Sequence, residues 1–302
     1  MQLPLKGIIP PLITPLLNYD KLDVQGLHNL IEHLISGRVH GLFILGTNGE
    51  AASLSYDLRK EVIKRTCEQV NHRIPVLVGI TDTSIAGLLE LSEYSKSSGA
   101  DAVVVAPPFY FPLDQEEIVD YYKVLASSLS LPFILYNIPS HTKVHLPVDT
   151  VIRMKELGAL GIKDSSGDLL YLYSLIEAFR DLPEFSVITG TELFLPETIF
   201  YGGHGAIPGG ANIFPQLFVK LYEASVNKDF DTIVYLREKV MKLNNTIYKV
   251  SKNPSRITIG TKCALSVMGI CNDYMVPPLH KMKPEERELI EKIVETFSKI
   301  HV

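Results

Sequence analysis

The sequence alternates between short apolar runs, which are typical of buried strands, and longer stretches in which apolar residues recur at helical spacing. The strand runs are continuously apolar, as in parallel sheets that helices cover on both faces. Eight such strand–helix units fall within residues 1–226, which fits a closed barrel better than an open sheet. We therefore expect an α/β fold of the TIM (β/α)8 barrel type with additional C-terminal helices. An open doubly wound sheet is the alternative, because hydrophobic periodicity is the same in both.

The expected elements divide the chain into a catalytic barrel, residues 1–226, and a helical extension, residues 227–302, that packs on the barrel. The expected strands are residues 7–15, which prolines interrupt or end, 39–45, 74–80, 101–106, 132–136, 158–163, 185–190 and 205–208. A helix is expected after each strand, and a loop over residues 137–147 precedes the helix that follows the fifth strand. Pro277 and Pro278 are expected to break the extension between two of its helices.

Composition and charge exclude several classes of function. The 302 residues are 46% hydrophobic and carry a net charge of −5 that is spread along the chain, which gives no basic surface for nucleic acid. The three cysteines form no CxxC pair and the histidines show no ligand spacing with carboxylates, so we expect neither a disulfide framework nor a metal site. No signal peptide and no membrane span are expected, and hence a cytoplasmic location.

Lys163 is the residue most suggestive of chemistry. It directly follows the buried strand run 158–162. Burial disfavours the ammonium form of lysine, and a neutral lysine amine is a nucleophile that forms Schiff bases with ketones. The alternative is structural: Lys163 pairs with Asp164 or ends the strand at the surface.

Other polar residues also follow predicted strands, and in a barrel of this type the active site lies at those C-terminal ends. The stretch Gly46-Thr47-Asn48-Gly49-Glu50 follows the second strand, and its N–H groups and hydroxyl can hold a carboxylate, although a simple tight turn is the alternative. Tyr136 ends the fifth strand, where its hydroxyl can relay protons. The aromatic loop 109–111 is expected to serve packing or an oligomer contact more readily than catalysis.

Together, the stretches Gly46 to Glu50, Tyr136 to Pro139 and Gly161 to Asp168 resemble the dihydrodipicolinate synthase / N-acetylneuraminate lyase family. The similarity covers nearly the whole chain. It implies a (β/α)8 barrel, usually a homotetramer built as a dimer of dimers. It also implies class I lyase or aldolase chemistry, in which a lysine forms a Schiff base with pyruvate or another 2-oxo acid without a metal or an organic cofactor.

The resemblance also implies roles for individual residues. Lys163 would form the Schiff base, and Tyr136 would carry protons to and from the substrate oxygens. Thr47, with the backbone N–H groups of Thr47 and Asn48, would hold the substrate carboxylate. Tyr110 would reach into the site of a neighbouring subunit. The remaining residues expected to line the substrate are Ile207, Ser165, Gly190, Glu192, Gly209 and His141.

Departures from the family pattern bear on the substrate. The dihydrodipicolinate synthases resembled here have an arginine where this chain has His141, and a second hydroxyl where it has Asn48. Histidine lacks the bidentate fork that grips a carboxylate. Sialic-acid lyases have an acidic pair where this chain has Glu192 and Leu193, and a serine at Gly209, so a long polyhydroxylated substrate would lose hydrogen bonds.

We therefore expect a lyase or aldolase that acts on a 2-oxo acid with pyruvate as one partner, such as a 2-keto-3-deoxy sugar acid or an N-acetylneuraminate-like compound. Three alternatives stay open. They are 4-hydroxy-tetrahydrodipicolinate synthase, a Schiff-base dehydratase or deaminase of a keto-acid, and, more remotely, a non-catalytic keto-acid-binding protein.

Overall fold

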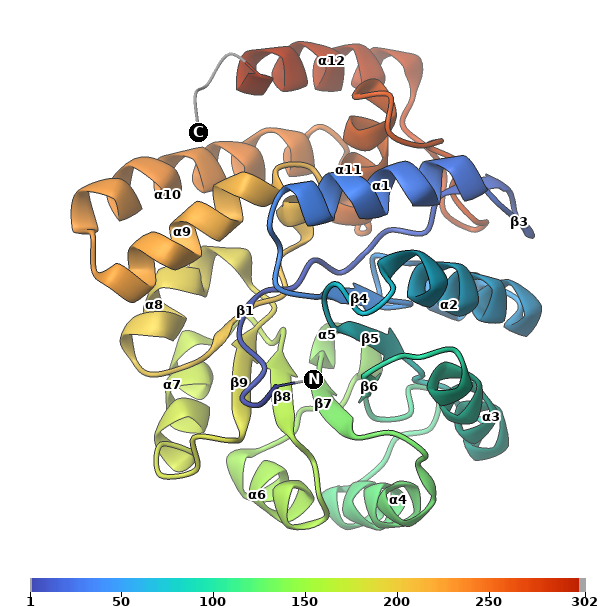
Figure 1. Cartoon of the computed structure of the whole chain (residues 1–302), viewed down its shortest axis with the longest axis vertical. Coiled ribbons are helices and arrows are strands. Elements are labelled where there is room, and N and C mark those ends of the chain that lie inside the picture. The colour runs from blue at the N-terminus through green and yellow to red at the C-terminus, as the bar shows by residue number, and fades with distance from the viewer. Residues whose placement is uncertain (1, 299–302) are drawn as a thin grey trace.

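A closed parallel barrel forms the centre of the molecule in the computed structural model, which describes residues 2–298 (Figure 1). Its eight strands hydrogen-bond in the order β1-β10-β9-β8-β7-β6-β5-β4. They are β1 (Gly7–Ile8), β4 (Leu42–Ile44), β5 (Val76–Gly79), β6 (Ala102–Val105), β7 (Phe133–Asn137), β8 (Gly161–Asp164), β9 (Ser186–Thr189) and β10 (Gly205–Ala206). Each strand overlaps a run predicted from the sequence, and β7 and β8 extend one residue past their predicted ends.

The barrel closes between the segment that follows β1 and strand β4. Phe43 N–H donates to the carbonyl of Pro10 at 3.0 Å, and Leu12 N–H donates to the carbonyl of Phe43 at 2.8 Å. Pro10 and Pro11 have no N–H of their own, which interrupts the pairing of this segment, and only Gly7–Ile8 forms a regular strand. The prediction of a TIM barrel is confirmed, and the open sheet is wrong.

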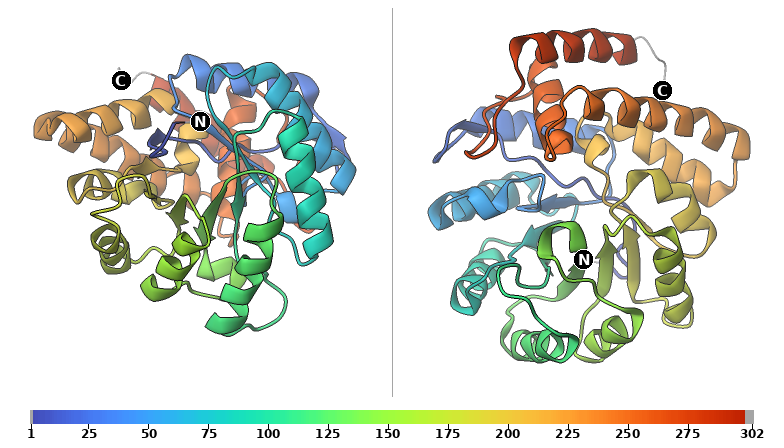
Figure 2. Two further views of the ribbon diagram at one scale, coloured as in Figure 1. Left: turned by 60° about the horizontal axis from the view of Figure 1, so that its bottom comes forward. Right: turned by 180° about the vertical axis from the view of Figure 1, so that it is seen from behind.

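Helices surround the barrel, as the views from other sides show (Figure 2). Those of the barrel are α1 (Val24–Ser36), α2 (Tyr56–Val70), α3 (Ile85–Ser97), α4 (Gln115–Ser128), α6 (Val148–Glu156), α7 (Leu169–Ala178), α8 (Leu195–Phe200) and α9 (Pro215–Asn227). Side chains of Asp23, Ser55, Asp114 and Asp168 accept hydrogen bonds from first-turn N–H groups and so begin α1, α2, α4 and α7. Within residues 2–298, no helix has the length and apolar content needed to cross a bilayer.

Two small elements were not predicted. A hairpin of β2 (Leu16–Asn18) and β3 (Lys21–Leu22) precedes α1, and its turn is stabilised by a hydrogen bond from Asp20 N–H to the Asn18 side chain. The loop expected after β7 contains the single turn α5 (Pro139–Thr142). Both are too short for hydrophobic periodicity to reveal.

The core has an inner and an outer part that follow from the alternation of side chains along each strand. An inner cluster inside the barrel includes Phe43, Val104, Ile134, Tyr136 and Ile188, whereas the next residues along the strands pack outward against the helices. Strands β7 and β8 pair with Tyr136 opposite Lys163. Because residues paired in register point to the same face, the two side chains lie next to each other inside the barrel.

The C-terminal helices are α10 (Phe230–Asn245), α11 (Arg256–Val267) and α12 (Pro284–Ser298), with the short turn η4 (Ile247–Lys249) after α10. They lie together along one side of the barrel (Figure 1). The exact division of the chain at residues 226 and 227 stays a prediction.

A buried ion pair ties this extension to the barrel. Lys262 of α11 is fully buried, and its Nζ lies 2.5 Å from Oε1 of Glu50, the last residue of the loop predicted to hold a carboxylate. Lys262 also donates to the carbonyl of Tyr274 at 2.6 Å, and Glu50 Oε2 accepts a hydrogen bond from Val276 N–H at 2.9 Å. The loop after β4 is therefore held in place by residues far away in sequence.

We expect Lys262→Met to lower the free energy of unfolding by about 3–5 kcal/mol, because it leaves the Glu50 carboxylate buried without its cation. The double variant Glu50→Gln/Lys262→Met removes both charges, so its free energy of unfolding should fall less than that of Lys262→Met alone. Urea unfolding of the four proteins measures the coupling as a double-mutant cycle. Additive losses from the two substitutions would contradict an ion pair that matters for stability.

Candidate active site

A cavity of about 270 Å³ opens at the C-terminal ends of the barrel strands. Ten of the eleven residues predicted for the site line it: Thr47, Asn48, Tyr136, His141, Lys163, Ser165, Gly190, Glu192, Ile207 and Gly209. They come from the ends of β4, β7, β8, β9 and β10 and from the turns that follow, which converge because the sheet is closed.

Lys163 is almost completely buried, and two aromatic rings flank its amine. The Nζ atom lies 4.2 Å from the centre of the Tyr136 ring and 5.0 Å from that of Phe43. No carboxylate within the described residues forms an ion pair with it. The neighbouring Asp164 instead accepts hydrogen bonds from the side chains of Asn137, at 2.8 Å, and Ser166, at 2.9 Å. The alternative in which Lys163 pairs with Asp164 is therefore wrong, and the amine faces the cavity.

Tyr136 is polarised by its surroundings. Burial by itself raises the pKa of its phenol, but the positive charge of Lys163 and hydrogen bonds with Thr47, Lys163 and Ser165 outweigh burial, so the pKa is lowered. The Thr47 hydroxyl lies 3.5 Å from the Tyr136 oxygen, at the long limit of a hydrogen bond. A phenol with a lowered pKa in contact with two hydroxyls and an amine is suited to moving protons.

The loop after β4 presents backbone donors to the cavity. The turn hydrogen-bonds through the N–H groups of Gly49, to Gly46 at 3.1 Å, and of Glu50, to Thr47 at 3.0 Å. The N–H groups of Thr47 and Asn48 make no hydrogen bond with the rest of residues 2–298. A side chain at Gly46 would lie 2.7 Å from the Phe43 ring, so this tight turn requires glycine there. Two successive free N–H groups form a site suited to a carboxylate.

Gly190 and Ser165 pack closely around the amine. A Cβ atom at Gly190 would lie 1.9 Å from the Ser165 hydroxyl and 3.0 Å from Cε of Lys163. The absence of a side chain at this position is thus what allows the lysine stem and the serine to share one end of the cavity.

Glu192 is a buried carboxyl group that also lines the cavity. Its Oε2 atom accepts hydrogen bonds from Gly210 N–H at 2.9 Å and from the Tyr248 hydroxyl at 3.4 Å, whereas Oε1 is buried without a partner among the described residues. Burial raises the pKa of Glu192 to about 7, and these two hydrogen bonds oppose the effect only in part. The side chain is therefore close to half protonated near neutral pH.

His141 lies at the exposed rim of the cavity, and its Nδ1 is 2.9 Å from the hydroxyl of Ser140. Partial burial and the positive charges of Lys143 and Lys163 lower its pKa, so the imidazole is neutral at neutral pH. Apart from Lys163, the residues that line the cavity include no lysine and no arginine.

Tyr110 is the predicted site residue that does not line this cavity. Its side chain is 77% exposed and contacts Phe111, which is 71% exposed, edge-on. Its expected role involves the site of a neighbouring subunit, and that role stays a prediction.

Several lining residues were missed by the sequence reasoning. They are Pro11, Ile138, Thr191, Leu193, Asn244, Tyr248 and Ile257. The last three belong to the C-terminal helices, where the sequence shows only ordinary helical patterns. No local signal distinguishes a helical residue that lines a cavity from one that packs in the core.

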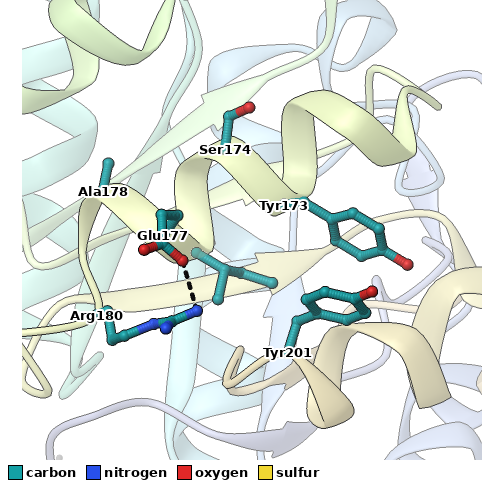
Figure 3. Close-up of a pocket in the computed structure, with 7 residues that line it drawn as sticks. Tyr173, Ser174, Glu177, Ala178, Arg180 and Tyr201 are labelled. Carbon is teal, nitrogen blue, oxygen red and sulfur yellow. Dashed lines mark ion pairs between the residues drawn. The ribbon is translucent and has the colours of Figure 1, made fainter.

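A second hollow lies on the outer surface, between α7 and α8 (Figure 3). The rings of Tyr173 and Tyr201 stack there with their centres 3.9 Å apart, and Arg180 pairs with Glu177 at 2.5 Å. It contains no residue from a strand end, so we assign it no catalytic role. The described residues include no group of three or more His, Cys, Asp or Glu side chains that could hold a metal ion.

Comparisons with known proteins agree with the fold described above. The profile described as "Dihydrodipicolinate synthetase family" matches residues 4–297. A 4-hydroxy-tetrahydrodipicolinate synthase from Bartonella bacilliformis is 32% identical over 95% of this chain and 96% of its own length. The same name is carried by a relative from Methanopyrus kandleri that is 32% identical over 97% of this chain and 96% of its own length.

Solved structures are similar over the full barrel and the C-terminal helices. The dihydrodipicolinate synthase of Bacteroides thetaiotaomicron is 49% identical, with a TM-score of 0.95 over 98% of this chain and all of the other. A prophage protein of E. coli K12, from the dihydrodipicolinic acid synthase family and in complex with pyruvate, is 28% identical, with a TM-score of 0.91 over 98% of this chain and 99% of the other.

The raised pKa of Glu192 predicts a pH-dependent loss of stability. A carboxyl group that ionises near 4.5 when unfolded but at about 7 when folded disfavours folding as the pH rises through that window. Relative to Glu192→Gln, the free energy of unfolding of the unmodified protein should fall by on the order of 3 kcal/mol between about pH 4.5 and pH 7. Urea unfolding at both ends of the window measures this, with the exposed Glu238→Gln as the control. Parallel stability curves for the unmodified protein and Glu192→Gln would contradict the assignment.

Proposed function

This chain belongs to the dihydrodipicolinate synthetase family, whose members are carbon–carbon lyases and synthases of the class I aldolase type, and on that premise we propose that Lys163 forms a Schiff base with pyruvate. The observation that supports this most directly is the buried amine beside the polarised phenol of Tyr136. A non-catalytic binding protein would not need a buried lysine amine next to a polarised tyrosine.

The proposed reaction begins when the neutral amine of Lys163 adds to the carbonyl carbon of pyruvate. The carbonyl oxygen leaves as water after it takes up protons, and Tyr136 supplies and recovers protons in this step. The resulting iminium accepts the electron pair of a C3–H bond while the Tyr136 oxygen takes up the proton, which gives an enamine. The enamine carbon then attacks an aldehyde, whose oxygen takes up a proton, and water releases the product and regenerates the amine. In the reverse direction the same steps cleave the carbon–carbon bond.

Thr47 and Asn48 would hold the pyruvate carboxylate through the two free backbone N–H groups and the Thr47 hydroxyl. Ile207 and Ser165, which line the same cavity, would contact the bound keto-acid. A carboxylate fixed in this way holds the carbonyl carbon against the amine, which is catalysis by positioning.

A homotetramer, built as a dimer of dimers, is part of the proposal. It is supported by the aromatic side chains of Tyr110 and Phe111, which are 77% and 71% exposed in one chain. In the assembly, Tyr110 would enter the site of a neighbouring subunit. The expected cytoplasmic location stays a prediction.

Two candidate reactions differ in the aldehyde that pyruvate meets. The names of the relatives favour 4-hydroxy-tetrahydrodipicolinate synthase, our alternative from the sequence, over the lyase for a 2-keto-3-deoxy sugar acid that we preferred. The residues that line the cavity favour the lyase. The synthases would need a cation to bind the carboxylate of the aldehyde, and this chain has the neutral His141 at that position. Dehydration or deamination through the same Schiff base remains a third possibility.

Borohydride reduction in the presence of pyruvate, followed by mass spectrometry, tests the proposal. We expect the mass of one reduced pyruvate on Lys163, and no adduct in Lys163→Arg. Tyr136→Phe should still be trapped but should lose about 10²–10³-fold in kcat, because a positioned proton carrier contributes that much. The exposed Tyr19→Phe serves as the matched control. An unmodified Lys163 would refute the proposed function.

A further inference from the structure

Part of the cavity wall is built by the C-terminal helices. Asn244 of α10, Tyr248 of η4 and Ile257 of α11 line it. If pyruvate occupies the space between Lys163 and Thr47, the aldehyde partner would lie against this part of the wall. Its chemistry therefore decides which partner fits.

Tyr248 orients Glu192. The phenol is 3% exposed, and burial together with the nearby Glu192 raises its pKa, so it remains a hydrogen-bond donor. Because Oε2 of Glu192 already accepts hydrogen bonds from Tyr248 and Gly210, a proton on this carboxyl group would lie on Oε1. Oε1 is the atom without a partner, and Glu192 is only 7% exposed. It can therefore donate or accept one hydrogen bond to a ligand.

Thr258 orients Asn48 in the same way. Its hydroxyl donates to Oδ1 of Asn48 at 3.1 Å, which directs the Asn48 amide nitrogen to the other side. A Cβ atom placed on Gly209 would lie 3.0 Å from that nitrogen and 3.4 Å from the Tyr248 oxygen. The amide and the phenol thus border the same space, which exists because residue 209 has no side chain.

The polar groups on this wall are the amides of Asn48 and Asn244, the phenol of Tyr248 and the carboxyl group of Glu192, whose pKa burial raises to about 7. None of them is a cation, and His141 at the rim is neutral. Hydroxyl groups can pair with all of these side chains. A second carboxylate would find no counter-charge here and would meet the partly ionised Glu192, which is costly at a buried site.

We propose that Tyr248 and Thr258 are positioning residues that act through Glu192 and Asn48 to make pyruvate's partner an uncharged, hydroxyl-bearing aldehyde instead of one with a carboxylate. This inference rests on the proposed function, since it concerns the second substrate of the same site. It gives residues of the C-terminal extension a part in the choice of partner, through their contacts with Glu192 and Asn48 of the barrel.

The test compares two aldehydes at saturating pyruvate: glyceraldehyde, which is uncharged, and aspartate β-semialdehyde, which carries a carboxylate. The unmodified protein should show a kcat/KM for glyceraldehyde at least about tenfold higher. Tyr248→Phe and Thr258→Val should each lower that value about tenfold, mainly through the KM of the aldehyde, because each removes a hydrogen bond in a buried site. Thr258→Ser, which keeps the hydroxyl, should restore it.

Tyr19→Phe and Thr296→Val, at exposed positions, are the matched controls, and thermal unfolding checks that each variant is folded. At saturating pyruvate, the yield of the borohydride adduct should not change in Tyr248→Phe or Thr258→Val. Equal losses with both aldehydes, or a preference of the unmodified protein for aspartate β-semialdehyde, would overturn the inference while the adduct on Lys163 still supports the proposed function. Absence of the adduct would instead remove the proposed function itself.

Discussion

Closure of the sheet is the constraint on which the site depends. Two hydrogen bonds between Phe43 and the segment Pro10–Leu12 join the segment after β1 to β4, and every other pair of neighbouring barrel strands is parallel. A closed parallel barrel brings all its C-terminal strand ends to one rim, whereas an open sheet would spread them over a long edge. Lys163, Glu192 and Thr47 can face a single cavity only for this reason.

Within that frame, the site depends on polar groups that are buried at some cost to stability. Lys163 lies among aromatic rings, Glu192 has an unpartnered oxygen, and Lys262 holds Glu50 beneath the loop that follows β4. Such groups are tolerated where other interactions fix them in place. The first two are open to a ligand, whereas the third is fully paired and supports the loop. Residues that can take part in the chemistry thus still have atoms free to bind a ligand. A structural residue such as Lys262 has all its partners within the protein.

The C-terminal helices contribute directly to the cavity and to the loop that borders it. They supply Tyr248 and Ile257 to the cavity wall, and Lys262 anchors the loop that contains Thr47. A barrel provides the amine and the proton carrier on its strands, which are rigid. The added helices border the region where a second substrate would lie, so changes there can alter specificity without disturbing the Schiff-base chemistry.

The sequence by itself determined the strand–helix alternation and the position of each barrel strand, because these are recorded in local hydrophobic patterns. Ten of the residues that line the cavity were predicted from polar residues at strand ends together with the resemblance to a known family. It did not reveal the short hairpin β2–β3, which lacks enough residues for a periodic pattern. Only the tertiary structure decided that the sheet closes, that Asp164 turns away from Lys163, and that Tyr248 meets Glu192 across 56 positions of the chain. The physical reason is that these contacts depend on packing between distant segments, and hydrophobic periodicity describes only how each segment meets its own immediate surroundings.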